Sequence, residues 1–520
     1  MFQTFYKPVF FSFLFCLTLS SFNSAAQGIG FDKVLRENGD RIMPFCVKNT
    51  QLHKENLEEQ GVRIKRITKN WIFFSCTPAW INEQKESGVI ESFYFERPSG
   101  RLMNDSTRAQ YHVNEVHQGL GGLPQGYTGK GVIVGVVDNG IDYRHPDFKD
   151  TNDRTRVLRY WDHTKFNGPD IPTGYAYGQE WDSTDINDAT ITSVDNQGHG
   201  STVAGAAAGN GRANGSNMGM APDADIVAVH TDFNLGNWTL TIADACEYIF
   251  SIANEYDRPC VINLSIGTYL GSHDGTDPAS EYMEALLDEK RGRIIVGAAG
   301  NSGAWGKYHV EGHASPDTSF TWMLNNPSNQ LAPNSIYGDV WLDSADAHTM
   351  SFGFGADSPT YSLRGQTALK LMSDNISTTY YDTIYNSNGD KIASIQAFRG
   401  YEGPNCHMEF LILVDSTSYK YRFMTAGQGQ WDIWSGLTLS LNEFEDDLPT
   451  TNEMPKIVDY QAPDTLKTIV SSWNCSEKVI SVGNVRNRAG HINYNGDQYT
   501  PSPADFKHVG ELSRNSSKAY

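Results

Sequence analysis

Apolar residues in the middle of the chain fall into two alternating patterns. Short, nearly continuous apolar runs occur at residues 132–137, 226–229, 261–264 and 294–296, as expected for strands that are covered on both faces. Between the later runs, apolar residues recur at helical spacing, as in Ile242, Cys246, Ile249, Phe250 and Ala253, and then in Met283, Leu286 and Leu287. Strands and helices that alternate in this order predict an α/β fold with a doubly wound parallel sheet.

A smaller unit precedes this region. Residues 62–67, 71–75 and 89–95 have the composition of strands. Thr77 followed by Pro78 predicts an N-cap and the first position of a helix, which Gly88 ends. We therefore expect a small α+β module, followed by a polar connector at residues 104–108 where proteolytic trimming would be easy.

The alternation of strands and helices stops after about residue 305 and returns at residues 469–485. The intervening segment predicts strands at residues 349–354, 368–372, 378–385, 392–398, 408–414, 419–424 and 430–434. Asn388 and Gly389 have the composition of a hairpin turn. This pattern predicts an all-β insertion of the sandwich or jelly-roll type.

The first residues of the chain have the composition of a secretory signal peptide. A single cation, Lys7, precedes an apolar stretch at residues 9–19, and small residues then lead to Ala26. The stretch is shorter than the ~20 residues that span a bilayer. We therefore expect cleavage after Ala26 and a protein that is extracellular, periplasmic or attached to the cell surface.

Length and composition fit an exported protein of several domains. The chain has 520 residues, of which 39% are hydrophobic, and 41 Lys and Arg face 61 Asp and Glu. The resulting charge of −20 repels phosphate backbones and argues against binding of nucleic acid. No later window predicts a membrane span. The predicted units are residues 1–26 (signal peptide), 27–105 (α+β module), 106–304 (α/β domain, first part), 305–464 (β insertion) and 465–520 (α/β domain, resumed).

The cysteines do not have the spacing of a metal site. The six that follow the signal peptide are Cys46, Cys76, Cys246, Cys260, Cys406 and Cys475. They form no CxxC pair and no Cys/His pattern, so we expect no zinc. Export permits disulfides, and Cys46 with Cys76 is the most local candidate pair, but the sequence does not determine the pairing.

Three polar residues follow buried or tightly packed segments. Asp138 ends an apolar strand, at the edge of the sheet where open α/β folds place their sites. His199 lies between two glycines that allow close approach of the backbone. Asn301 follows a buried strand and a run of small residues. An Asp can orient a His, and an Asn side chain can donate to a developing oxyanion, so the three predict a hydrolytic site.

The motifs around these residues resemble those of the subtilisin-like serine proteases (subtilases, peptidase family S8). The chain reads GVVDNGID at 135–142, QGHGSTVAG at 197–205, VINLSIG at 261–267 and GAAGNSG at 297–303, in the family's order. The resemblance covers roughly residues 111–301 and resumes weakly near residue 469. It implies a subtilisin-like parallel sheet, a propeptide at residues 27–105, and a β insertion between the Asn and Ser motifs.

The resemblance also implies roles for individual residues. Asp138 orients His199, His199 serves as general base and then general acid, and Asn301 stabilises the oxyanion. The segment of Ser265, Ile266 and Gly267 corresponds to the strand that pairs with extended peptide or protein substrates. The expected partners are therefore such substrates and the chain's own propeptide.

The family's nucleophile lies in a GTSxAxP motif, and no such string occurs in the 520 residues. Ser502, Ser513, Ser516 and Ser517 lack its context. We therefore expect the sequence to stop short of the nucleophile, and we expect this chain by itself to be inactive in the serine mechanism. The alternative function is that of a protease-derived module that binds peptides or proteins without cutting them.

Acidic residues between the Asp and His motifs raise the question of a metal. Asp182, Asp185, Asp188 and Asp195 lie in one polar segment, and carboxylates of this kind hold calcium in some relatives. A solvated loop is the interpretation that we favour. No cofactor is expected apart from such a structural calcium ion.

Overall fold

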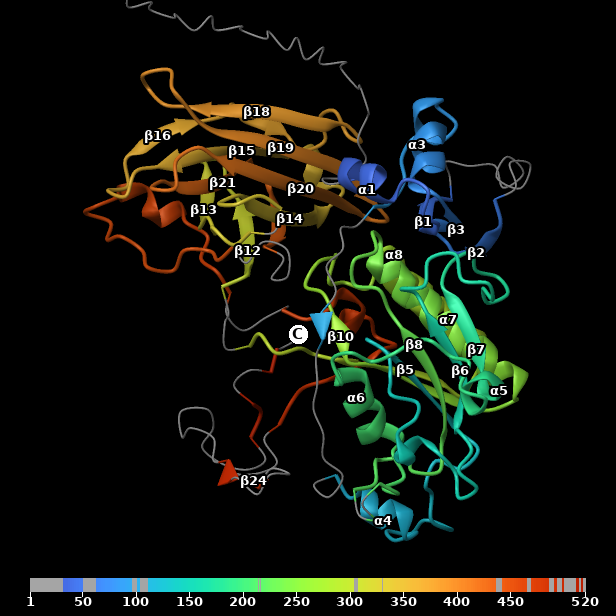
Figure 1. Cartoon of the computed structure of the whole chain (residues 1–520). Helices are drawn as coiled ribbons and strands as arrows, with labels where there is room; N and C mark the ends of the chain where they lie inside the picture. Colours follow the sequence, from blue (N-terminus) through green and yellow to red (C-terminus); the bar gives the residue numbers. More distant parts are fainter. Residues whose placement is uncertain are drawn as a thin grey trace, which may run out of the picture.

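The computed structural model describes residues 31–49, 62–95, 101–102, 111–213, 215, 217–303, 307–329, 331–435, 442–464, 469–485, 491–492, 498–499, 511–513 and 516–517. The predicted signal peptide and the connector at residues 104–108 lie outside this part. Figure 1 shows the β-rich unit above the α/β unit, with the N-terminal module beside both. No helix of the described part is long and apolar enough to cross a lipid bilayer.

A seven-stranded sheet is the centre of the α/β unit. Its order is β23-β11-β9-β5-β8-β6-β7, and all neighbours are parallel except β6 and β7. The strands are β5 (Ile133–Asp138), β6 (Val157–Asp162), β7 (Gln179–Asp182), β8 (Asp225–His230), β9 (Cys260–Leu264), β11 (Arg293–Ala298) and β23 (Ile480–Val482). The predicted α/β fold is therefore confirmed, with one antiparallel strand at its edge.

Helices cover both faces of this sheet. They are α6 (His199–Ala208), α7 (Trp238–Glu255) and α8 (Pro278–Glu289), with the shorter α4 (Val113–His117), α5 (Ser183–Asn187) and the 3-10 turns η1 (Pro146–Phe148) and η4 (Ser472–Cys475) around them. Successive residues of β5 point to opposite faces. Val137 packs in the cluster that contains α7, whereas Val136 packs in the cluster that contains α6. The sheet is therefore buried on both sides.

The N-terminal module is a three-stranded antiparallel sheet with two helices. Its elements are α1 (Phe31–Asn38), β1 (Met43–Lys48), β2 (Ile64–Ile67), β3 (Trp71–Cys76) and α3 (Pro78–Glu86), and the sheet order is β1-β3-β2. The predicted cap is confirmed, since Thr77 Oγ1 accepts a hydrogen bond from the Trp80 amide at 3.1 Å.

Two predictions for this module are wrong. Residues 89–95 form no strand and make only the isolated bridge between Cys46 and Tyr94. Their apolar side chains are buried in the module core without extended pairing, and burial alone produced the strand-like pattern. The Cys46–Cys76 disulfide does not form, because Cys46 lies opposite Phe73 in the sheet. All six cysteines of the described part are free.

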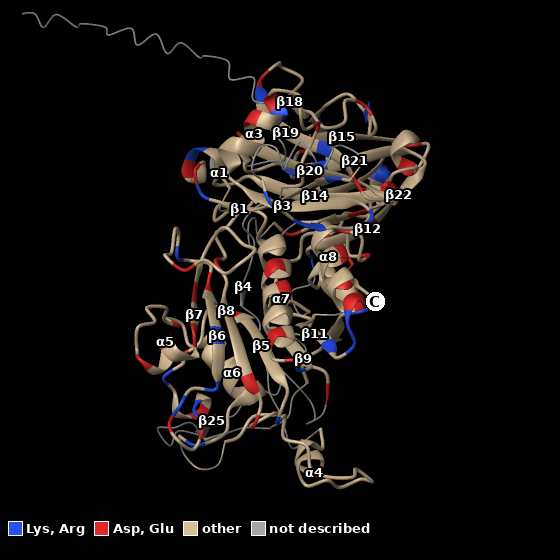
Figure 2. Cartoon of the chain, turned by 90° about the vertical axis from the view of Figure 1, so that its right-hand side faces the viewer, with Lys and Arg blue, Asp and Glu red and all other residues tan. Residues whose placement is uncertain are grey.

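Ion pairs join the module to α7 and α8, whose acidic residues are visible in Figure 2. Arg66 reaches Glu289 at 2.7 Å and Glu247 at 3.2 Å. Lys65 bonds Asp244, and the two side chains are 3% and 1% exposed. Cationic residues of the module thus meet acidic residues of the α/β unit in a largely buried contact.

The β-rich unit consists of two antiparallel sheets, of orders β12-β22-β14-β20-β19-β18 and β13-β21-β15-β16, with β17 beside β15. Their strands are β12 (His309–Ala314), β13 (Ser319–Met323), β14 (Ile336–Asp343), β15 (Met350–Asp357), β16 (Leu363–Gln366), β17 (Lys370–Leu371), β18 (Thr379–Tyr385), β19 (Lys391–Glu402), β20 (Asn405–Val414), β21 (Lys420–Gly427) and β22 (Gly429–Trp434). One hydrophobic cluster takes side chains from both sheets, so they pack face to face.

All seven strands predicted in this unit are confirmed, and the hairpin at Asn388 and Gly389 joins β18 to β19. Four strands of this unit, β12, β13, β14 and β16, were not predicted. Polar residues interrupt two of them, including Asp339 in β14 and Glu311 in β12. The remaining elements are η2 (Asp346–His348), η3 (Pro455–Asp459), β24 (His491–Ile492) and β25 (Gln498–Tyr499).

Candidate active site

The side chains of Asp138 and His199 are in direct contact. Asp138 ends β5 and His199 begins α6, and Asp138 Oδ1 lies 2.8 Å from His199 Nδ1. The Asp138 side chain is fully buried, and that of His199 is 15% exposed. A carboxylate can only accept, so His199 Nδ1 carries the proton and Nε2 is left as the basic nitrogen.

The two glycines beside His199 have separate functions. Gly198 is the N-cap of α6 and has a left-handed backbone, with φ of 76°. Gly200 packs against the loop after β5, and a Cβ atom there would lie 1.9 Å from the Gly140 carbonyl oxygen and 3.0 Å from Asp138 Cβ. The first glycine turns the chain into the helix, and the second lets the helix approach Asp138.

Asn139 and Asp195 hold the start of α6. Asn139 Oδ1 accepts a hydrogen bond from the Gly200 amide at 2.8 Å, and its Nδ2 donates to Asp195 at 3.1 Å. Asp195 in turn accepts from the Gly198 amide at 2.7 Å and from the Ser201 hydroxyl at 2.7 Å. These bonds fix His199 relative to the end of β5. This role of Asn139 could not be predicted from the sequence, since an Asn after a strand has no signature of its own.

Burial and hydrogen bonding shift the two carboxyl groups in opposite directions. Burial raises the pKa of Asp138, although the hydrogen bond from His199 opposes the change. Burial also acts to raise the pKa of Asp195, but hydrogen bonds from Ser201, Gly198 and Gln197 outweigh it and lower that pKa. Asp195 is therefore a stable anion that positions α6, whereas burial makes the charged form of Asp138 less favourable.

His199 Nε2 is buried and has no hydrogen-bond partner within the described part of the chain. The hydroxyl groups of Ser516 and Ser517 have other partners. The Asn484 amide donates to Ser516 Oγ at 2.9 Å, and the Ser302 amide donates to Ser517 Oγ at 3.0 Å. Ser513 donates its amide to the Asn484 carbonyl. None of these three serines contacts His199, and Ser502 lies outside the described residues.

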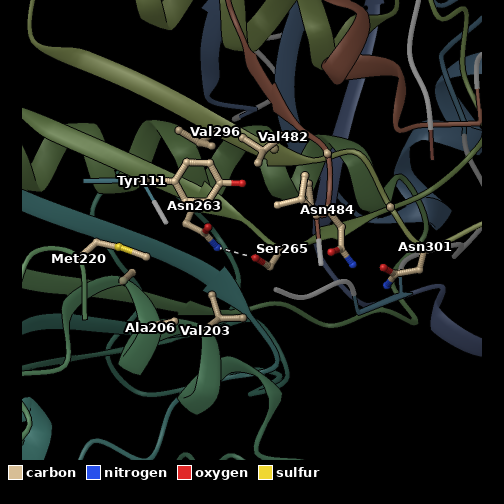
Figure 3. A pocket seen from close by; sticks show the side chains of 16 residues that line it. Tyr111, Val203, Ala206, Met220, Asn263, Ser265, Val296, Asn301, Val482 and Asn484 are labelled. Carbon is tan, nitrogen blue, oxygen red and sulfur yellow. Dashed lines mark hydrogen bonds between the residues drawn. The ribbon is translucent and has the colours of Figure 1, made fainter. Parts of the chain in front are cut away.

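Asn301 and Ser265 line one cavity of about 290 Å³ at the carboxyl ends of β9 and β11 (Figure 3). Asn263 also lines it and donates to Ser265 Oγ at 2.9 Å. Val203 contributes the wall from α6, one helical turn beyond His199. The cavity therefore joins the predicted oxyanion residue and the predicted substrate strand to the helix that carries the base.

The small residues before Asn301 allow a close approach. A Cβ atom at Gly297 would lie 2.0 Å from Asn474 Oδ1, and Asn474 Nδ2 donates to the Ala298 carbonyl at 2.8 Å. A Cβ atom at Gly303 would lie 1.9 Å from the Ser516 carbonyl oxygen. The GAAGNSG segment is thus packed tightly on both sides. Asn474 and Asn263 are further residues of this region that the sequence analysis missed.

The predicted substrate strand is occupied by the chain itself. Ile266 and Gly267 form the short strand β10, which pairs antiparallel with β4 (Arg101–Leu102). Leu102 lies opposite Ile266, and Arg101 lies opposite Gly267. The edge at Ile266 therefore accepts an extended chain through backbone hydrogen bonds, as the peptide-binding role requires.

The acidic residues that suggested calcium have other contacts. Asp182 and Asp185 form a capping box at the start of α5, and Asp195 holds α6. Within the described residues no group of three or more His, Cys, Asp or Glu is arranged to hold a metal ion. A solvated loop stays the interpretation that the sequence favours, with a structural calcium ion as the alternative.

The structure thus brings the predicted residues together in two groups. Asp138 and His199 form one, and Asn301 and Ser265 form the other around the cavity, with β10 beside them. Within the described part of the chain, no hydrogen bond joins Asn301 to His199.

Comparison with known proteins finds similarity to proteases. The model of the Subtilase family matches residues 129–387, which contain Asp138, His199 and Asn301. The PII-type proteinase of Lacticaseibacillus paracasei is 31% identical over 196 residues, which are 35% of this chain and 10% of that protein. The serine protease AprX of Bacillus subtilis (strain 168) is 26% identical over 305 residues, 57% of this chain and 59% of that protein.

A second relative from Bacillus subtilis and one solved structure are also similar to this chain. The minor extracellular protease Vpr of Bacillus subtilis (strain 168) is 31% identical over 180 residues, 34% of this chain and 18% of that protein. The match therefore covers only 10% of the PII-type proteinase, 18% of Vpr and 59% of AprX. The structure of the Clostridium perfringens CspB protease has a TM-score of 0.53 at 21% identity and covers 76% of this chain and 72% of that one, which supports the fold.

Proposed function

Because this chain is a subtilase-like protein, we propose that it is an exported serine-type endopeptidase that cleaves peptide bonds by an Asp-His-Ser mechanism. The observation that carries the proposal is the 2.8 Å contact between Asp138 Oδ1 and His199 Nδ1. It fixes the tautomer of His199 and directs the basic Nε2 away from the carboxylate. This is the arrangement that a general base for a serine hydroxyl requires.

His199 would take the proton from the serine hydroxyl as its oxygen attacks the scissile carbonyl. It would then give that proton to the leaving amine. Asp138 would stabilise the imidazolium between these steps. Asn301 would donate its side-chain amide to the oxyanion of the tetrahedral intermediate, a contact worth about 3 kcal/mol in acyl transfer.

The substrate would bind as an extended strand on Ser265, Ile266 and Gly267. The pairing of β4 with β10 supports this, because Arg101 and Leu102 already lie there as an antiparallel strand. We propose that residues 27–105 act as a propeptide. The buried ion pair of Lys65 with Asp244 and the occupied edge at β10 support that role.

The mechanism needs a serine beside His199 Nε2, and the described residues place none there. A fluorophosphonate probe tests the proposal, since it reacts with an activated serine. We expect the 520-residue chain to remain unlabelled and not to cleave casein. We expect labelling when a segment carrying the GTSxAxP motif is joined to it, and loss of labelling in the His199→Ala variant.

His145 offers a matched control for that variant. Its side chain is 45% exposed and has no part in the proposed site, so His145→Ala should retain the labelling. Labelling that survives His199→Ala would show that His199 is not the base. Labelling of the 520-residue chain at any residue would show that the nucleophile lies within it.

A second function is favoured because no described residue bonds His199 Nε2 and because the edge of β10 is occupied. In this alternative, the chain is a protease-derived module that binds extended peptides or proteins without cutting them. A chain that captures casein fragments, resists labelling and gains no activity from the added motif would be such a module.

A further inference from the structure

The loop that follows the substrate strand is attached to the β-rich unit. It runs from Thr268 to α8, and it contains Gly271, whose φ is 116°. The Gly271 amide donates a hydrogen bond to Asp339 Oδ2 at 3.2 Å. Asp339 belongs to β14 and is 2% exposed. A buried carboxylate of the β unit therefore holds the backbone four residues beyond Gly267.

Asp339 is held in place by two further groups. Trp341 Nε1 donates to the same Oδ2 at 3.0 Å, and His407 Nε2 lies 2.5 Å from Oδ1. The rings of Trp341 and His407 stack, with centroids 4.1 Å apart and an angle of 12°. Both oxygens of Asp339 are thus bonded, so the carboxylate has one fixed orientation toward Gly271.

His407 is positioned between two carboxylates. Its Nδ1 lies 2.8 Å from Glu402 Oε1, and its Nε2 faces Asp339. Because both ring nitrogens face acceptors, both must donate, and the ring is an imidazolium. Burial opposes the charge, but Glu402 and Asp339 outweigh burial and hold the pKa of His407 well above its ordinary value.

The charged and titratable groups around His407 and Asp339 come from the β-rich unit, the N-terminal module and the loop after β10. Asp339 and Glu402 come from β14 and β19 of the β-rich unit. Lys48 of the N-terminal module interacts with Glu402, and His273 of the loop interacts with Asp339. Asn405, on the hairpin after Glu402, donates to Asp274 at 2.7 Å. The contact is therefore a junction of the module, the β-rich unit and the loop after β10.

We infer that Asp339, oriented by protonated His407, is a positioning residue that holds the substrate strand in register for an extended peptide. The inference rests on the proposed function, because the register of this strand affects catalysis only if the strand aligns a peptide for cleavage. Loss of the His407 proton removes the donor to either Asp339 or Glu402, and the buried carboxylates then repel each other. The loop at Gly271 is released, and the edge at Ile266 and Gly267 loosens with it.

Hydrogen–deuterium exchange of the full chain tests this without any cleavage. We expect exchange at residues 266–271 to rise about tenfold or more in Asp339→Asn and in His407→Gln, because a hydrogen bond to a buried charge is lost. In the wild-type chain, exchange corrected for intrinsic rates should rise as alkaline pH removes the His407 proton. In His407→Gln it should not change with pH over that range.

Asp357 provides the matched control. It is fully buried in the other sheet of the same unit, and it accepts from Arg422 Nη2 at 2.6 Å and from Trp322 Nε1 at 2.7 Å. It therefore has the same combination of a cation and an indole, with no contact to the loop. Asp357→Asn should leave exchange at residues 266–271 unchanged.

Three outcomes overturn the inference: unchanged exchange in Asp339→Asn, an equal rise in Asp357→Asn, or a wild-type pH profile that His407→Gln reproduces. If Asp339→Asn unfolds the β-rich unit, which exchange in β21 would report, the wild-type pH series and His407→Gln still decide. If the chain joined to the GTSxAxP segment is not labelled by the fluorophosphonate probe but the exchange pattern is observed, the proposed function alone is contradicted.

Discussion

The backbone of Gly140 touches that of Gly200 so closely that a Cβ atom on residue 200 would lie 1.9 Å from the Gly140 carbonyl oxygen. This contact sets the distance between the end of β5 and the start of α6. The Asp138–His199 hydrogen bond spans the same gap. The geometry of the pair therefore depends on a residue that takes no part in the chemistry.

Gly200→Ala should separate Asp138 from His199. The added methyl group must displace the helix, at a cost of about 2 kcal/mol or more in the free energy of unfolding. Urea denaturation measures the loss. Gly205→Ala is the control in the same helix, because a Cβ atom there has open space and should stabilise the helix by about 0.5–1 kcal/mol. Equal losses in both variants would contradict the steric explanation.

Asp138→Asn should not destabilise the folded chain. Burial raises the pKa of Asp138, so the folded state keeps a proton that the unfolded state has already released, and wild-type stability falls as pH rises through this raised pKa. Removing the charge should leave the free energy of unfolding at neutral pH unchanged or raise it by about 1 kcal/mol. Urea unfolding at several pH values checks this. A variant less stable than the wild type at every pH would refute it.

Asp195→Asn should have the opposite effect. The pKa of Asp195 is lowered, so its contribution to stability is present above the unfolded pKa and is lost as pH falls through the folded one. The Gly198 amide donates to Oδ1 and the Ser201 hydroxyl donates to Oδ2. An Asn side chain keeps only one acceptor oxygen, so one of these two hydrogen bonds is lost, at a cost of about 1–3 kcal/mol.

Thermal denaturation at neutral and acidic pH measures this difference, which should shrink as the solution becomes acidic. Asp188→Asn is the control, since Asp188 is exposed and should change stability by less than about 0.5 kcal/mol. A difference for Asp195→Asn that persists at low pH would show that its charge is not the cause.

Lys65→Ala should weaken the attachment of the N-terminal module. It leaves Asp244 buried without its cation, at a cost of about 3–5 kcal/mol. Limited proteolysis of the module measures the change, and exposed Lys69 gives the control in Lys69→Ala. Lys65→Met combined with Asp244→Asn should recover most of the loss, because the amide still accepts from the Tyr177 hydroxyl. No recovery would indicate that packing of the lysine stem dominates.

The α/β unit could be predicted from the sequence because its buried strands are continuous apolar runs. Thr77 and Pro78 likewise predicted the start of α3. Residues 89–95 show the limit of such patterns, since an irregular segment that is buried alternates in the same way as a strand. Strand β14 shows the opposite limit, because buried Asp339 interrupts its apolar run.

Asp138 and His199 could be recognised from their motifs, yet their contact depends on the packing of α6 against the end of β5, which joins two residues 61 positions apart in the chain. The supporting residues were harder to predict. The side chain of Asn139 acts through two hydrogen bonds to residues distant in sequence, and that of Asn263 acts through a hydrogen bond to Ser265. An asparagine of this kind has no periodicity and no fixed spacing, so only the folded chain reveals its partner.

If the edge of β10 binds peptides as proposed, its pairing with β4 also affects how that binding is measured. A peptide added in solution must compete with Arg101 and Leu102, which are tethered to the same chain. A tether of this kind corresponds to an effective concentration on the order of millimolar. Affinities measured on the intact chain will therefore be weaker than the intrinsic affinity of the edge, and removal of the tether should increase them without any change in the residues that contact the peptide.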